Sequence, residues 1–370
     1  MRVRLRKAAA RAILGLSLSL TLGLGLFGAA AALPLDVHQG DWRIGAFTFR
    51  DGQALADLHL HYRTLGQPRR DPSGRVTNAV LLLHGTGGTG AQFLQPQFAE
   101  VLFRPGGQLD PQRYYIIMPD NVGHGLSSRP SEGLHARFPQ YDYDDMVLLQ
   151  HRLLAEHLGV SRLRLILGTS MGCMHGFVWG ETFPNEMDAI AAFACAPTQI
   201  SGRNRLWRKM AMDAIRADPA WFGGEYQHQP VEGLRAANDL LIIAGAAPHQ
   251  MQAAQGTRDL ADAFLAQQLP ARLAASDAND VWYALNASRT YDPSGSLEKI
   301  RAPLLWINSA DDFINPPELQ VGERFGPRLS TTRFVLLPIG PNTHGHGTHT
   351  WAVAWESYLA ELLVKTELRP

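Results

Sequence analysis

The stretch that decides the fold is LRLILGTSMGCM, residues 163–174, in which a short apolar run leads directly into the pattern G-x-S-x-G. Residues 163–167 have the length and composition of a buried strand, and a helical stretch follows Gly172. Gly168 and Gly172 stand where larger side chains would collide, because strand and helix meet in a sharp turn. This context predicts Ser170 as a nucleophile, held in a strained backbone conformation at a helix N-terminus, where a developing anion is favoured.

A serine hydroxyl becomes nucleophilic only when an oriented base removes its proton. The apolar run Leu304–Ile307 reads as a strand and leads into Asp311 and Asp312. Asp312 lies four residues before Pro316, a D-x-x-x-P spacing. We therefore assign Asp312 as the acid that orients the base, and we interpret Asp311 as a residue that caps the loop.

The candidate base lies in His344–His349, HGHGTH, which follows the last predicted strand, Arg333–Leu337. We select His346 because its flanking glycines give the ring free approach to the serine. Three histidines within six residues also suggest a metal site, but no nearby carboxylate or cysteine completes a set of ligands. We therefore expect no metal, with His344 in the loop and His349 at the start of the terminal helix.

An oxyanion formed at the serine needs two backbone N–H donors. Met171, directly after the nucleophile, supplies one of them. The other is assigned to Thr86, because His84-Gly85-Thr86-Gly87-Gly88 follows the apolar run Asn78–Leu83. No Lys-Ser/Thr follows these glycines, and their spacing does not match the dinucleotide fingerprint, so the sequence predicts no bound cofactor.

Short apolar runs recur along the chain, separated by longer amphipathic stretches such as Asp144–Leu158 and Trp351–Leu363. This alternation of predicted strands and helices is typical of a mostly parallel central sheet flanked by helices, an α/β fold. The alternating pattern of residues 41–64 adds antiparallel edge strands at the start. The predicted parallel strands are Asn78–Leu83, Tyr114–Met118, Leu163–Leu167, Ile190–Ala194, Leu304–Ile307 and Arg333–Leu337.

The alternation of strands and helices stops between residues 197 and 300, where helix-like segments such as Arg205–Arg216 and Thr257–Gln268 occur without a clear strand. We interpret residues 197–300 as a helical cap inserted into a core made of residues 33–196 and 301–370. The tryptophans in this region could face a substrate or form the core of the cap. For any single one of them we expect the core. They are Trp207, Trp221 and Trp282.

Residues 1–32 have the order of a secretory signal peptide: a basic region, the apolar run Ala12–Phe27, and small residues from Ala29 to Ala32. We expect cleavage after Ala32 and a periplasmic or secreted enzyme. An uncleaved anchor is the alternative, because the uncharged stretch Ile13–Leu33 is long enough to span a bilayer.

The composition of the chain excludes other classes of protein. A hydrophobic content of 45% excludes wholesale disorder, and two cysteines exclude a disulfide framework. Beyond residue 32 the chain carries 29 basic and 34 acidic residues, which argues against nucleic acid as a partner. Cys173 and Cys195 could lie close together, but we expect two buried free thiols because disulfide geometry is demanding.

With Ser170, Asp312, His346 and the inserted helices, the chain resembles the homoserine O-acetyltransferase-like family of the α/β-hydrolase fold from about residue 62 to 355. Asp312 has the D-x-x-x-P spacing common in that fold. The resemblance implies acyl transfer through a serine ester, with a small-molecule acyl substrate and no metal or prosthetic group, and it is compatible with a homodimer. It rests on Tyr62–Gly66, Leu109–Pro111, Gly168–Met174, Asp218–Trp221, Asp312–Pro317 and Gly345–His349.

The chain departs from that family at several positions. Leu83–Gly87 replaces a C-H-A-L-T-like loop, Asp120–Ser127 is more like general esterases, and Cys173 and His175 replace a usual glycine and glutamine. An exported enzyme would also lack the cytoplasmic acetyl-CoA pool. We therefore expect an exported ester hydrolase, with an O-acyltransferase acting on a small hydroxyl acceptor as the alternative and a catalytically silent binding module as a third.

Overall fold

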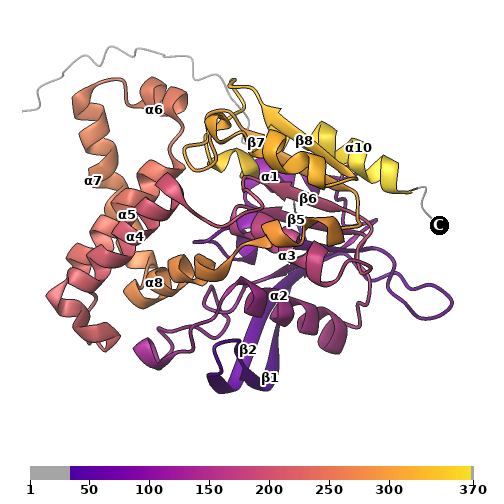
Figure 1. Ribbon diagram of the computed structural model, residues 1–370, viewed down its shortest axis with the longest axis horizontal. Coiled ribbons are helices and arrows are strands. Elements are labelled where there is room, and N and C mark those ends of the chain that lie inside the picture. Colours follow the sequence, from indigo (N-terminus) through magenta and orange to yellow (C-terminus); the bar gives the residue numbers. More distant parts are fainter. Residues whose placement is uncertain (1–33, 368–370) are drawn as a thin grey trace, which may run out of the picture. The chain divides into compact units, whose positions relative to one another are not determined.

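The computed structural model describes residues 34–367, and its centre is a sheet of eight strands (Figure 1). The strand order is β1-β2-β4-β3-β5-β6-β7-β8, in which only the β1–β2 and β2–β4 pairs are antiparallel. This confirms the predicted mostly parallel sheet with its antiparallel edge. The strands are β1 His38–Thr48, β2 Ala54–Leu65, β3 Ala79–Leu83, β4 Tyr115–Pro119, β5 Leu165–Thr169, β6 Ile190–Phe193, β7 Leu304–Ser309 and β8 Thr332–Leu337.

Helices cover both faces of the sheet, which explains why its central strands are apolar throughout. Successive residues of a strand point to opposite faces. Leu81 packs in the same core cluster as α2 and α3, whereas Leu82 packs with α1 and α10. These helices are α1 Pro96–Leu102, α2 Tyr143–Arg152, α3 Met171–Thr182 and α10 Glu356–Glu367, and the short α9 spans Val321–Phe325.

Five α-helices lie between β6 and β7, and Figure 1 shows them grouped to one side of the sheet. The predicted helices in this region correspond to α4 and α7, but α5, α6 and α8 were not individually predicted. Residues 197–300 contain no strand, and their boundaries as a separate cap stay a prediction. The helices are α4 Gly202–Ala217, α5 Val231–Gly245, α6 Pro248–Ala254, α7 Arg258–Ala275 and α8 Ala278–Asn286.

The three tryptophans of this region do not share one role. Trp221 donates its indole N–H to Asn279 Oδ1 at 3.0 Å, and Trp282 packs against Tyr283, so both belong to the packing of the helices. Trp207 is buried and also lines a cavity described below.

Two predicted helices have different limits in the structure. The stretch from Asp144 continues beyond α2 as a π-helical turn, Leu153–Leu158. At the C-terminal end the chain first forms 3-10 turns at Gly347–Thr350 and Ala352–Ala354, so α10 begins only at Glu356.

The predicted signal peptide and its cleavage site lie outside the described residues. Within residues 34–367 there is no helix with both the length and the apolar character needed to cross a membrane.

Candidate active site

Ser170 stands alone in the turn between β5 and α3, with a strained backbone at φ 54° and ψ −110°. A Cβ on Gly168 would collide with the carbonyl oxygen of Gly172, and one on Gly172 with that of Leu83. Both glycines are therefore required by the close contact between strand and helix. The Ser170 N–H donates to the Phe193 carbonyl at 2.8 Å, which ties the turn to β6.

The structure brings His346 and Asp312 to this serine. His346 Nε2 lies 2.8 Å from Ser170 Oγ, and its Nδ1 lies 2.9 Å from Asp312 Oδ2. Asp312 is 2% exposed, and its carboxylate also accepts hydrogen bonds from the Ile314 N–H and the Asn315 side chain. Burial acts to raise the pKa of Asp312, but His346 and these donors outweigh burial and hold it below its ordinary value. The carboxylate is thus ionised near neutral pH.

Two neighbours of Asp312 support the loops that carry the site. Asp311 accepts a hydrogen bond from the Gly345 N–H at 3.0 Å and another from the Ser309 hydroxyl, so it holds the histidine loop as well as its own. Asn315 links Asp312 to the carbonyl of Ala194, each at 3.1 Å. The sequence did not indicate a role for Asn315, because nothing local distinguishes it from other loop asparagines.

The other two histidines of the loop pack against rings. His344 stacks on Trp351, with ring centroids 3.7 Å apart. His349 lies edge-on to His346, and burial, together with the charge of His346, lowers its pKa to about 3, so it is neutral. His349 was predicted at the start of the terminal helix, but it belongs to a 3-10 turn before that helix. Within residues 34–367 the structure contains no cluster of three or more His, Cys, Asp or Glu side chains arranged to hold a metal ion.

The loop with Thr86 lies directly against Ser170. A Cβ on Gly85 would stand 3.4 Å from the Ser170 Cβ, and Thr86 lines the same cavity as Ser170 and His346. Among residues 34–367, the backbone N–H groups of Thr86 and Met171 have no hydrogen-bond acceptor. Both therefore remain able to bind an oxyanion.

Two side chains hold this loop in place, and the sequence alone indicated this role for neither of them. Gln92 accepts from the Gly85 N–H at 3.2 Å and donates to Thr169 Oγ1 at 2.8 Å. His84 Nε2 accepts the Asn121 N–H, so its proton lies on Nδ1 and is donated to the Gly85 carbonyl at 2.8 Å. Because a trans peptide directs its C=O and N–H to opposite sides, this bond turns the Thr86 N–H away from His84.

Beneath the loop lies a buried polar network. Gln150 Nε2 donates to Asn121 Oδ1 at 2.6 Å and lies 3.1 Å from His175 Nδ1. Burial lowers the pKa of His84 to about 3 and that of His175 well below its ordinary value, so both rings are neutral. Two of the positions that depart from the resembled family, Asn121 and His175, thus belong to one buried network below this loop.

Two cavities of about 820 and 600 Å³ open beside Ser170, and Ser170, His346 and Arg208 line both of them. The larger runs between the inserted helices and residues 310–316, and the smaller lies between the Thr86 loop and α5. Nothing in the sequence distinguished Arg208 from the other cations of α4.

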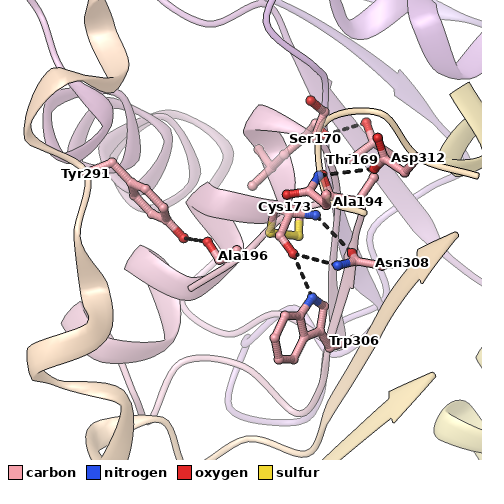
Figure 2. Close-up of a disulfide and its surroundings, with 12 residues drawn as sticks. Thr169, Ser170, Cys173, Ala194, Ala196, Tyr291, Trp306, Asn308 and Asp312 are labelled. Carbon is pink, nitrogen blue, oxygen red and sulfur yellow. Dashed lines mark hydrogen bonds between the residues drawn. A yellow bond between two sulfur atoms is a disulfide. The ribbon is translucent and has the colours of Figure 1, made fainter. Parts of the chain in front are cut away.

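The expectation of two free thiols was wrong, because Cys173 and Cys195 form a disulfide. β5 and β6 pair with Thr169 opposite Phe193, which brings the first turn of α3 beside the residues after β6 and places the two Cα atoms 5.9 Å apart. The side chains of Trp306 and Asn308, labelled in Figure 2, both donate to the Cys195 carbonyl, at 3.0 and 3.2 Å.

Comparison with known proteins identifies the family to which the chain belongs. Residues 78–329 match the family model of the α/β-hydrolase fold. The chain is 29% identical over 279 residues to a probable acyltransferase of Methanothermobacter thermautotrophicus, covering 75% of this chain and 84% of that protein. It is 33% identical over 204 residues to a homoserine O-acetyltransferase of Solidesulfovibrio magneticus, but this match spans only half of each chain.

Solved structures share the fold at low sequence identity. Esterase E22 has a TM-score of 0.77 and 20% identity, covering 88% of this chain and all of that one. Homoserine O-acetyltransferase from Bacillus anthracis has the same TM-score and identity, covering 90% and 98%. The chain is therefore an enzyme of the α/β-hydrolase fold family.

Proposed function

We propose that the protein is an ester hydrolase that forms an acyl-enzyme on Ser170, with His346 as the base and Asp312 as the residue that orients it. The observation that carries this proposal is the contact of 2.8 Å between Ser170 Oγ and His346 Nε2, with the other ring nitrogen on a buried carboxylate. A neutral imidazole in this tautomer accepts the hydroxyl proton at Nε2.

The reaction follows from these positions. His346 takes the Ser170 proton as the oxygen attacks the ester carbonyl, and the N–H groups of Thr86 and Met171 bind the resulting oxyanion. When the intermediate collapses, the C–O bond breaks and the imidazolium gives its proton to the leaving alcohol. Water then attacks the acyl-enzyme with His346 again as base, which releases the carboxylic acid and restores the serine.

Transfer to a hydroxyl acceptor is the second candidate, because the relatives include a protein named homoserine O-acetyltransferase. Hydrolysis is favoured by the chain's own loops, since Leu83–Gly87 and Asp120–Ser127 depart from the resembled transferases. Export through residues 1–32, which is part of the proposal, would also separate the enzyme from cytoplasmic acyl-CoA. Edman sequencing of the protein recovered from a periplasmic fraction should then begin at Leu33.

The test of the reaction uses short-chain 4-nitrophenyl esters and a fluorophosphonate probe. The wild-type enzyme should hydrolyse the esters and carry the label on Ser170 in a peptide mass spectrum. Ser170→Ala should lose both, whereas Ser73→Ala, in an exposed turn, serves as the matched control. Unchanged turnover by Ser170→Ala would refute the proposal. Products formed with small alcohols present decide between the two candidates, because a new ester supports transfer and free acid alone supports hydrolysis.

A further inference from the structure

One charged group beside the nucleophile has no part in the proposed reaction. Arg208, on α4, is 2% exposed and lines both cavities together with Ser170 and His346. Its side chain is therefore removed from bulk water but faces the space in which a substrate would lie.

In the part of the chain that the structure describes, the guanidinium of Arg208 has no counter-charge. Its Nε donates to Asn204 Oδ1 at 3.1 Å, and the group lies 4.8 Å from the centre of the Trp207 ring. Among residues 34–367 there is no carboxylate within ion-pair distance of Arg208, and its Nη1 is buried without a hydrogen-bond acceptor. The Tyr143 hydroxyl is close but uncharged, and burial lowers the pKa of Arg208.

An isolated buried cation is costly unless something pairs with it. The charged groups lining the smaller cavity do not do so, because in the described chain they are Arg208 and Arg272 with no acid. The larger cavity has acidic neighbours, but Asp312 is bound to His346 and Asp311 to Gly345. Its remaining acid, Glu318, is exposed.

We propose that the substrate is an ester that carries a carboxylate, and that Arg208 binds this carboxylate while the ester carbonyl lies at Ser170. The two terminal nitrogens of a guanidinium match the two oxygens of a carboxylate, and such charge-assisted pairs give both strength and orientation. This inference rests on the proposed ester hydrolysis. It adds the chemical class of the substrate, which neither the triad nor the oxyanion donors define.

The carboxylate could belong to the acyl part or to the alcohol part of the ester, because Arg208 lines both cavities. Two matched pairs of esters separate these cases. The first is the 4-nitrophenyl monoester of succinate against its methyl ester, and the second is 3-acetoxypropanoate against its methyl ester. Within each pair the methyl ester removes the negative charge and adds one methyl group, so release of 4-nitrophenol or of acetate is followed rather than cleavage of the methyl ester.

The measured quantity is the preference, defined as kcat/KM for the anionic ester divided by kcat/KM for its neutral partner. The wild-type enzyme should prefer the anion in at least one pair. Arg208→Gln should reduce that preference about 10- to 100-fold, mainly through KM, as expected for a lost charge-assisted bond. Arg208→Lys should retain part of it. Arg205→Gln is the matched control, because Arg205 lies on the same helix, is half-buried and lines neither cavity.

The outcomes separate the two proposals. If the wild-type enzyme hydrolyses none of the esters, the proposed function fails. If it hydrolyses them without a preference for the anion, the inference of a carboxylate-bearing substrate is overturned, but the proposed ester hydrolysis is not. The same holds if Arg208→Gln slows both members of a pair equally. Thermal unfolding and the rate of fluorophosphonate labelling establish that Arg208→Gln is folded. A misfolded glutamine variant is replaced by Arg208→Lys, whose failure to change either preference would also overturn the inference.

Discussion

His346 Nε2 lies 2.8 Å from Ser170 Oγ, although 176 residues separate the two in the chain. Ser170 follows β5, and His346 lies in the loop after β8, with β6 and β7 between these strands. Parallel strands end at one edge of a sheet, where crevices for ligands form. Loops that are distant in sequence therefore deliver their side chains to a common place, and Asp312 arrives there from the loop after β7.

Asp312 should be essential for catalysis rather than for binding. Asp312→Asn keeps the size of the side chain but removes the charge that holds the Nδ1–H tautomer of His346. We expect kcat to fall about 10³- to 10⁴-fold with little change in KM, by analogy with the same substitution in a serine protease triad. Asp311→Asn should lose much less, because Asp311 supports the loop without contacting the imidazole. Equal losses in the two variants would contradict these assignments.

Gln92 should act as a positioning residue for the oxyanion donors. Gln92→Ala removes the acceptor of the Gly85 N–H and the link to Thr169. Because the loop is loosened but no donor is deleted, we expect kcat to fall on the order of 10-fold, less than the 10²- to 10³-fold loss for a removed oxyanion donor. Steady-state kinetics on 4-nitrophenyl acetate measure this. Gln97→Ala, on α1, is the control, and a change confined to KM would argue against the assignment.

Local patterns were sufficient to predict the sheet. Each predicted parallel strand overlaps a strand of the structure, because short apolar runs bounded by turn residues have few alternatives inside a covered sheet. The helix predicted from Trp351 failed at its start. Trp355 is buried and donates its indole N–H to the Thr348 carbonyl, so the chain turns there before α10 begins.

The candidate triad could be predicted because each residue has a local context: Ser170 in its turn, Asp312 after a strand, and His346 between glycines. Other residues of the site could not be found in this way. α4 contains several cations, and only tertiary packing separates the buried Arg208 from Arg205. The disulfide was missed for a similar reason, because its formation depends on the register of β5 against β6.

The disulfide should stabilise the fold by restricting the unfolded chain. Cys173 and Cys195 close a loop with a sequence separation of 22, for which chain entropy gives about 3 kcal/mol. The double variant Cys173→Ala, Cys195→Ala should therefore lower the free energy of unfolding by about this amount, as measured by urea denaturation. Reduction of the wild-type protein should have a similar effect, and the same reductant should leave the variant unchanged. A wild-type protein insensitive to reduction would contradict the prediction.

Glu181, in the last turn of α3, should make stability fall as pH rises. Burial, followed by the charge of Asp144, raises its pKa to about 7, and within residues 34–367 its Oε2 has no hydrogen-bond partner. The ordinary pKa of a glutamate is about 4.5. Between pH 4.5 and pH 7 the folded state therefore holds the proton of the Glu181 carboxyl more firmly than the unfolded chain does. Stability linked to Glu181 is therefore complete at low pH and is lost across this window.

Glu181→Gln should remove that loss, since the amide cannot ionise. The variant should be more stable than the wild-type protein at pH 8, and the difference should shrink towards pH 4.5, as followed by urea unfolding at several pH values. The difference should be modest because the side chain is partly exposed, and solvent weakens the penalty on its charge. Glu100→Gln, at an exposed position of α1, tests whether loss of any carboxylate has this effect. Stability curves for Glu181→Gln and wild type that run parallel across the pH range would show that Glu181 does not titrate in this window, because only a group that changes its protonation there can make the two curves converge.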